Sequence, residues 1–112
     1  MAKGNLVEFN EGNWASEVAG SDKPVLVDFF GTWCPPCKAL LPTIVKVADQ
    51  FAGKVKVGKV NIDDNQELAV KYGITSVPQV LIFQGGDQPK YRRAGIVPEA
   101  ELVKMLTEVS AG

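Results

Sequence analysis

The sequence contains no histidine, and this absence removes several kinds of active site before any motif is considered. A cysteine nucleophile that depends on a neighbouring imidazole base is excluded. A zinc site needs about four nitrogen or sulfur ligands, whereas the chain offers only 2 cysteine thiols. Metal binding within one chain is therefore not expected, although two copies could in principle pool their cysteine pairs.

Long hydrophobic runs and an excess of one charge are also missing. No apolar run approaches the length of a membrane span, and residues 1–5 lack the apolar centre of a secretory signal, so the cytoplasm is the default compartment. The formal net charge of -1 gives no electrostatic reason to expect nucleic acid or an anionic membrane as a partner. A small basic cluster at Lys90, Arg92 and Arg93 is expected to be a solvated strand face.

Strand-like and helix-like segments alternate through the first half of the chain. Strands are expected over residues 5–9, 24–30, 54–62 and 80–83, with a return strand over 90–94. Helices are expected over residues 11–19, 34–51, 66–72 and from Pro98 onward. The alternation indicates parallel crossovers, and the late hairpin adds antiparallel strands. The 112 residues therefore predict a single α/β domain over residues 1–112, with a mixed central sheet between helices.

The 2 cysteines belong to one motif, Cys34-Pro35-Pro36-Cys37, at the predicted start of a helix. A disulfide between them closes too short a loop to constrain the unfolded chain much, which favours a redox-active pair over a structural one. Unpaired N–H groups at a helix start favour an anion, so the leading thiol can become a thiolate. The motif predicts Cys34 as the exposed nucleophile and Cys37, one turn further in, as the resolving thiol.

Two charged residues interrupt the predicted buried strands. Asp28 lies in an otherwise apolar run, so its carboxylate is either paired or carries a raised pKa. Lys59 has the same side-chain parity as Val55 and Val57 and can point inward as well. An Asp28–Lys59 pair, direct or through water, would explain both positions. A purely structural ion pair, or a Lys59 ammonium that reaches solvent, explains them too.

Three residues near the motif have local explanations. Trp33 lies at the strand-to-helix turn, which favours a partly exposed ring, whereas Trp14 is expected in the core. Pro78 opens a strand-like run, where a residue without an N–H is tolerated, and a cis bond is possible but not required. Gly95 either permits a close backbone approach or simply belongs to a turn.

Taken together, the motif and its flanking segments resemble one known protein family. Residues 27–38, Val-Asp-Phe-Phe-Gly-Thr-Trp-Cys-Pro-Pro-Cys-Lys, are similar to the active-site segment of thioredoxins. The likeness continues in order through Pro42, residues 60–63, residues 72–74, residues 77–78, Phe83, Gly86 and Gly95. It implies the thioredoxin fold, a five-stranded mixed β-sheet flanked by four α-helices, and a protein-disulfide oxidoreductase with no bound cofactor.

The resemblance also implies roles for single residues. Cys34 would attack a substrate disulfide, and Cys37 would resolve the mixed disulfide through a reversible Cys34–Cys37 bond. Asp28, together with Lys59, would assist proton transfer at Cys37. Pro78 would be cis and pack against the dithiol, and the backbone near Val77 would pair with the substrate. The docking surface for disulfide-containing proteins would consist of Trp33, Pro36, Val77, Pro78, Gly95 and Ile96.

Two residues depart from the family pattern. Pro35 stands where a glycine is usual, giving CPPC in place of CGPC, and Phe30 stands where a tryptophan is common. Pro35 fixes one more φ angle and removes an N–H that could have faced a Cys34 thiolate. Pro35 and Pro36 are therefore candidates for tuning the redox potential, in a direction that does not follow from sequence.

The predicted function is that of a monomeric, cytoplasmic, thioredoxin-type protein disulfide reductase. The resemblance implies that its electrons come from NADPH through a flavin-dependent thioredoxin reductase. A more oxidising thiol oxidase or disulfide isomerase is an alternative within the same chemistry. A non-catalytic thioredoxin-fold binding subunit is an alternative of another class, and the intact Cys34, Cys37 and Asp28 argue against it.

Overall fold

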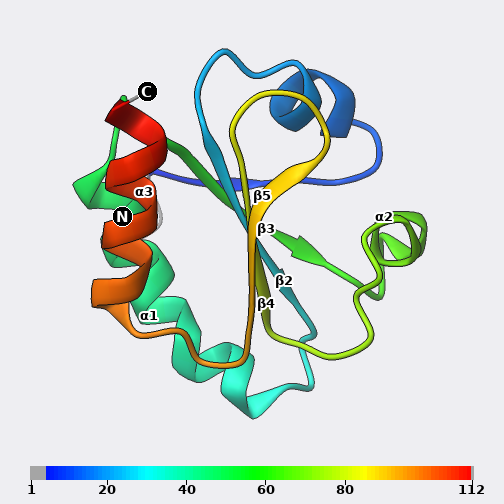
Figure 1. Cartoon of the computed structure of the whole chain (residues 1–112). Coiled ribbons are helices and arrows are strands. Elements are labelled where there is room, and N and C mark those ends of the chain that lie inside the picture. Colours follow the sequence, from blue (N-terminus) through cyan, green and yellow to red (C-terminus); the bar gives the residue numbers. More distant parts are fainter. Residues whose placement is uncertain (1–4, 112) are drawn as a thin grey trace.

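The computed structural model describes residues 5–111, in which a central sheet is covered by helices on both faces (Figure 1). The strands are β1 (Leu6–Glu8), β2 (Val25–Phe30), β3 (Lys56–Asn61), β4 (Gln79–Phe83) and β5 (Pro89–Ala94). The helical segments are η1 (Ala15–Ala19), α1 (Pro35–Gln50), α2 (Gln66–Lys71) and α3 (Glu99–Ala111). Residues 1–4 and 112 lie outside the described residues. Part of the N-terminus in which no secretory signal was expected, and both ends of the predicted single domain, therefore lie outside them as well.

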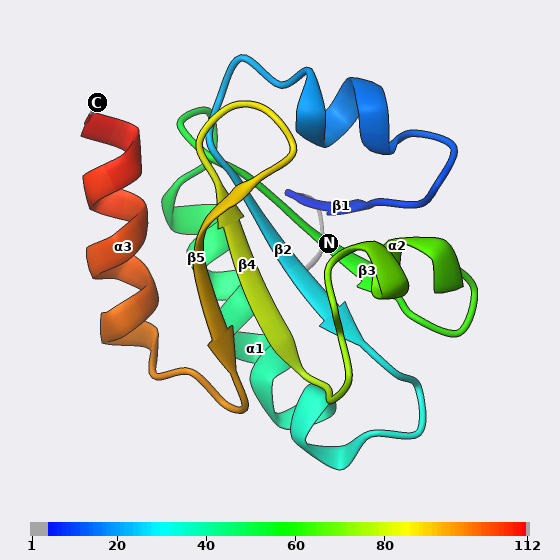
Figure 2. The ribbon, with the colours of Figure 1, turned by 45° about the vertical axis from the view of Figure 1, so that its right-hand side comes forward.

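The sheet has the strand order β1-β3-β2-β4-β5. β1 and β2 both pair parallel with β3, whereas β4 runs antiparallel to both β2 and β5. Figure 2 shows β2 and β3 in the middle of this arrangement and β5 at its edge. The predicted fold, a five-stranded mixed sheet with helices on both sides, is therefore confirmed. No helix among residues 5–111 is long and apolar enough to span a membrane.

Each face of the sheet has its own hydrophobic core. On one face α1 and α3 pack over alternate residues of the central strands, including Leu26 and Ile82. On the other face η1 and α2 pack over the intervening residues, including Val27 and Leu81. Because successive side chains of a strand point to opposite faces, Asp28 shares the face of Leu26 and lies under α1.

The first helical segment differs from its prediction. A helix was expected over residues 11–19, but only Ala15–Ala19 is helical, as a π-type turn in which the Gly20 N–H donates to the Ala15 carbonyl at 2.8 Å. Reciprocal bonds between the backbone N–H groups and side-chain oxygens of Asn10 and Asn13 hold a turn before it, which delays the helix start. Trp14 is buried at the front of this turn, as predicted.

Candidate active site

The cysteine pair lies at the N-terminus of α1, immediately after β2. Cys34 is the N-cap residue and Cys37 belongs to the first turn; the two are joined by a disulfide with a Cα–Cα distance of 5.3 Å. The Cys37 N–H donates to Cys34 Sγ at 3.1 Å. Pro35 and Pro36 carry no N–H, so Cys37 supplies the only backbone donor of the first three helical positions. The sulfur of Cys34 is thus held by the helix that it caps.

Both cysteines are buried in this disulfide form, with exposed fractions of 2% for Cys34 and 4% for Cys37. The prediction of an exposed Cys34 is therefore wrong for this state. The physical reason is the loop before β4, which brings the Val77 carbonyl oxygen to 3.7 Å from Cys34 Sγ. A disulfide sulfur has no proton, so this contact becomes a hydrogen bond only when Cys34 is reduced.

Asp28 lies beneath the pair, with an exposed fraction of 1%. Its Oδ1 atom has no hydrogen-bond partner among the described residues. Asp28, Cys37 and Lys59 line one pocket of about 230 Å³. Burial raises the pKa of Asp28 to about 7, against the opposing effect of the Lys59 charge. Asp28 can therefore exchange a proton near neutral pH beside the resolving thiol.

Lys59 is the register partner of Asp28 on β3, and it lines the same pocket. The direct Asp28–Lys59 ion pair that the sequence suggested is not formed among the described residues. The Lys59 Nζ instead lies over the Phe30 ring, 5.2 Å from its centroid. A cation over an aromatic face keeps favourable electrostatics without entering the buried site. A water link to Asp28 stays a prediction. Phe30, one of the two departures from the family pattern, thereby gains a place beside Lys59.

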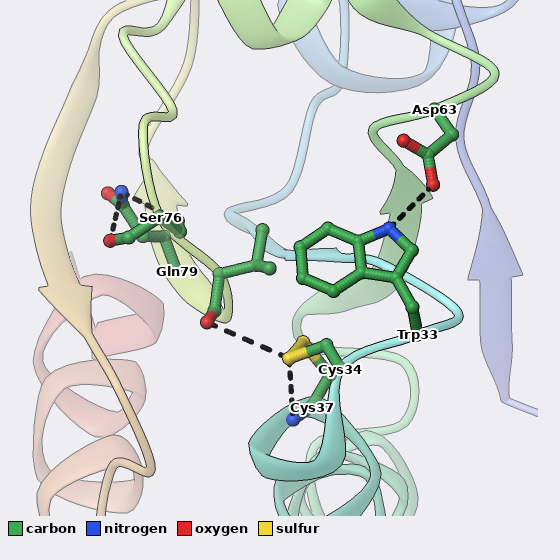
Figure 3. The surroundings of a disulfide bond; sticks show 7 residues. Trp33, Cys34, Cys37, Asp63, Ser76 and Gln79 are labelled. Atoms are coloured by element: carbon green, nitrogen blue, oxygen red, sulfur yellow. Dashed lines mark hydrogen bonds between the residues drawn. A yellow bond between two sulfur atoms is a disulfide. The ribbon is translucent and has the colours of Figure 1, made fainter.

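Several of the predicted docking residues lie close to the disulfide, either next to it in the chain or through the loop that contacts Cys34. Figure 3 shows Trp33 on one side of the disulfide, and Trp33 is 63% exposed, as expected for a ring at the turn. The Val77-Pro78 bond, in the loop whose Val77 carbonyl approaches Cys34, is cis, as the resemblance implied. The Gly95 N–H donates to the Pro78 carbonyl at 2.9 Å, which places Gly95 next to this loop. Ile96 and Pro36 are exposed as well. Their roles in docking stay predictions.

The sequence assigned no role to three residues that shape this surface. The Trp33 Nε1–H donates to Asp63 Oδ2 at 2.9 Å (Figure 3). Gly31 leaves room for the same indole, because a Cβ there would lie 2.7 Å from Trp33 Cε2. Gln79, at the start of β4, is buried although its side chain is polar. The one sequence signal was the polar Gln79 before an apolar run; nothing local singled out Gly31 or Asp63.

A dithiol–disulfide pair that caps a helix, above a buried carboxyl and beside a cis-proline, defines a thiol–disulfide exchange site. The family model described as Thioredoxin matches residues 5–108. The chain belongs to the thioredoxin family. Its Cys34–Cys37 pair is accordingly a dithiol–disulfide exchange centre of the thioredoxin type.

Individual relatives agree with this assignment. The chain is 43% identical over 101 residues to Thioredoxin M5, chloroplastic, of Oryza sativa subsp. japonica, covering 90% of this chain and 58% of that protein. It is 42% identical over 99 residues to Thioredoxin 1 of Nostoc sp., covering 88% of this chain and 92% of that one. The chain thus spans little more than half of the rice relative and most of the Nostoc relative.

A solved structure has the same fold. The crystal structure of chloroplastic thioredoxin z superposes with a TM-score of 0.85 at 30% identity and covers 96% of both chains. One longer relative, from Mycobacterium leprae, is named a bifunctional thioredoxin reductase/thioredoxin; the chain is 37% identical to it over 106 residues and spans 23% of its length.

Proposed function

We propose that this protein reduces disulfide bonds of other proteins by dithiol–disulfide exchange. The observation that carries the proposal is the shared pocket of Asp28 and Cys37, since a carboxyl with a pKa of about 7 is suited to accept a thiol proton near neutral pH. A structural disulfide would have no use for such a group.

The exchange moves two electrons to the substrate in two steps. The Cys34 thiolate attacks one sulfur of the substrate disulfide, forms a mixed disulfide and releases the other substrate sulfur as a thiolate. Cys37 then loses its proton to Asp28, and its thiolate attacks Cys34 Sγ. This second attack breaks the mixed disulfide, releases the second substrate thiolate and closes the Cys34–Cys37 bond. Asp28 then releases the Cys37 proton to solvent, and the two substrate thiolates take up protons from solvent. The substrate is thereby reduced to a dithiol, and the protein is oxidised.

The direct test is the reduction of insulin disulfides with dithiothreitol as the electron donor. Wild-type protein should accelerate the reaction, and Cys34→Ser should abolish the acceleration. Cys37→Ser should instead accumulate a mixed disulfide with the substrate, detectable by mass spectrometry. Equal activity of Cys34→Ser and wild type would contradict the proposal.

Two prolines lie between the thiols and can change the redox potential, so the direction of the reaction, reduction or oxidation of the substrate, needs its own test. An oxidase or isomerase would use the same atoms with a less negative potential. Equilibration with a glutathione redox buffer separates the two functions. A midpoint near those of oxidising dithiol proteins would replace the reductase assignment.

A non-catalytic binding subunit is tested separately, by complementation. A variant with both Cys34→Ser and Cys37→Ser should fail wherever the wild type works. Full complementation by that variant would support docking without chemistry.

The partners and setting follow from the proposed chemistry. The oxidised protein needs a donor, and we propose NADPH through a thioredoxin reductase, as the name of the fused Mycobacterium leprae relative suggests. We also propose a monomer in the cytoplasm, where thiols are kept reduced. Sedimentation of the purified chain tests whether it is a monomer, and localisation in the native cell tests the compartment.

A further inference from the structure

The loop that carries Val77 to the disulfide has little backbone support of its own. β4 begins at Gln79, so Thr75, Ser76 and Val77 lie outside the sheet. Within residues 5–111 these three residues make no backbone–backbone hydrogen bond. The position of the Val77 carbonyl, 3.7 Å from Cys34 Sγ, must therefore be fixed by side chains and by the chain on either side.

Gln79 supplies that support. Its Nε2 atom donates to the Ser76 carbonyl at 3.0 Å and lies 3.4 Å from Ser76 Oγ (Figure 3). The backbone of Gln79 is itself held on both sides, by Phe29 of β2 and Ala94 of β5. A bond from this fixed point to the Ser76 carbonyl orients the peptide plane between Ser76 and Val77, and so the residue that faces the disulfide.

Arg92 holds the other end of the same amide. Its Nη1 atom donates to Gln79 Oε1 at 3.1 Å. The bond comes from an exposed residue of β5, in the basic cluster that the sequence explained only as a solvated face. With its oxygen occupied by Arg92, the Gln79 amide is turned so that its NH₂ group faces Ser76. Two hydrogen bonds thus connect Arg92 to Gln79 and Gln79 to Ser76.

We infer that Gln79, oriented by Arg92, is a positioning residue that presets the Val77 backbone for pairing with protein substrates. The inference rests on the proposed reductase function and adds a specificity element to it. A substrate with a peptide backbone next to its disulfide gains from a preset Val77, because no ordering of the loop is then required on binding. A small disulfide without a backbone gains nothing from it.

A second glutamine, which directly follows β4, provides a matched control. Gln84 also bridges a cation and a backbone carbonyl: Lys90 Nζ donates to Gln84 Oε1 at 3.2 Å, and Gln84 Nε2 donates to the Val109 carbonyl at 3.1 Å. It follows β4, whereas Gln79 begins that strand beside the disulfide. Gln84→Met therefore removes the same kind of bridge at the opposite end of the strand.

The experiment compares two disulfides with each prereduced variant, insulin and the small neutral 2,2′-dipyridyl disulfide. Gln79→Met should lower the rate constant for insulin about five- to tenfold, as expected for one lost hydrogen bond, and leave that for dipyridyl disulfide within about twofold. Arg92→Met should lower only the insulin rate, by about two- to threefold, since its bond comes from an exposed side chain. Gln84→Met should change neither rate.

The ratio of the two rate constants separates positioning from general stability. An equal loss toward both disulfides, or no loss toward insulin, would overturn the inference. If Gln79→Met does not fold, as judged by its thermal unfolding, Arg92→Met decides alone: a selective loss supports the inference, and an unchanged ratio overturns it. Failure of the proposed function would appear differently, as a wild-type protein that reacts with dipyridyl disulfide but does not reduce insulin.

Discussion

Asp28 and Lys59 lie opposite each other on the neighbouring parallel strands β2 and β3, yet their charged groups form no ion pair among residues 5–111. The ammonium of Lys59 lies over Phe30, and the carboxyl of Asp28 is left buried with an unpartnered oxygen. Lys59 still lowers the pKa of Asp28 through space, but burial has the larger effect and raises it to about 7. A directly paired aspartate would instead remain charged well below that pH.

The first prediction concerns stability. A carboxyl whose pKa is raised in the folded state favours folding less as pH rises, because the unfolded chain releases its proton first. The loss begins near the ordinary pKa of 3.8 and is complete above about 7. We expect Asp28→Asn to stabilise the disulfide form by about 2–4 kcal/mol at pH 8 and to have little effect at pH 4, the upper limit following from that pKa difference.

Urea unfolding at the two pH values measures this difference. The exposed Asp64→Asn is the control, since it removes an equal charge from a solvated carboxylate, and it should change stability by less than about 0.5 kcal/mol. Equal stability of Asp28→Asn and wild type at pH 8 would show that burial does not raise the pKa of Asp28 in the folded protein.

The second prediction concerns catalysis. If Asp28 accepts the Cys37 proton, the rate of mixed-disulfide resolution should rise with pH around 7, where Asp28 becomes ionised. Asp28→Asn should abolish that rise and slow resolution by about tenfold or more at pH 8. Stopped-flow release of the substrate thiol from a preformed mixed disulfide measures the step.

Lys59→Met provides the matched variant for this experiment. Loss of the Lys59 charge removes the one influence that lowers the pKa of Asp28, so the midpoint of the rate profile should move to higher pH. A profile that stays in place would assign the proton to another group.

The third prediction concerns Gly31. Its φ angle is not in the left-handed region, so alanine is compatible with the backbone, but the added Cβ would lie 2.7 Å from Trp33 Cε2. Gly31→Ala should displace the indole and break its hydrogen bond to Asp63. The Trp33 indole N–H resonance should shift in NMR spectra, and insulin reduction should fall about threefold, as for one weakened contact.

Trp14 serves as the internal reference for that measurement. Its buried Nε1–H donates to the Tyr72 hydroxyl at 3.2 Å, in the core on the other face of the sheet from α1. Its resonance should stay in place in Gly31→Ala. An unchanged Trp33 resonance would contradict the prediction, because it would mean that the backbone around residue 31 moves and the indole keeps its position.

The fourth prediction concerns Pro35. Cys34 Sγ already accepts from the Cys37 N–H, and an N-cap side chain accepts from the second or third helical position and not from the first, where Pro35 lies. Pro35→Gly should therefore leave the pH dependence of Cys34 alkylation unchanged. It should give the dithiol form more backbone freedom, worth about 0.4–1 kcal/mol, and make the potential less negative by about 10–20 mV.

Equilibration with glutathione measures that potential, and iodoacetamide reactivity across pH reports the Cys34 thiolate. A shifted alkylation profile would show that the missing N–H at position 35, and not backbone freedom, is the main effect of the proline.

Local patterns were sufficient for the elements and for the redox pair. The apolar run of β2, the helical spacing after it and the two thiols at the turn between them are neighbours in the chain, so their arrangement follows from short-range rules. The same rules placed Asp28 in a buried strand. They failed for residues 11–19, where paired asparagine side chains competed with the helix.

The sequence by itself determined the α/β elements, the family and the chemistry of Cys34 and Cys37. Only the tertiary structure decided how that chemistry is enclosed: Val77 reaches Cys34 across 43 positions, and Asp63 reaches Trp33 across 30. The burial of Cys34, the place of Lys59 over Phe30 and the support of the loop by Gln79 depend on such contacts. Their geometry is set by the packing of both sheet faces at once, which no local pattern encodes.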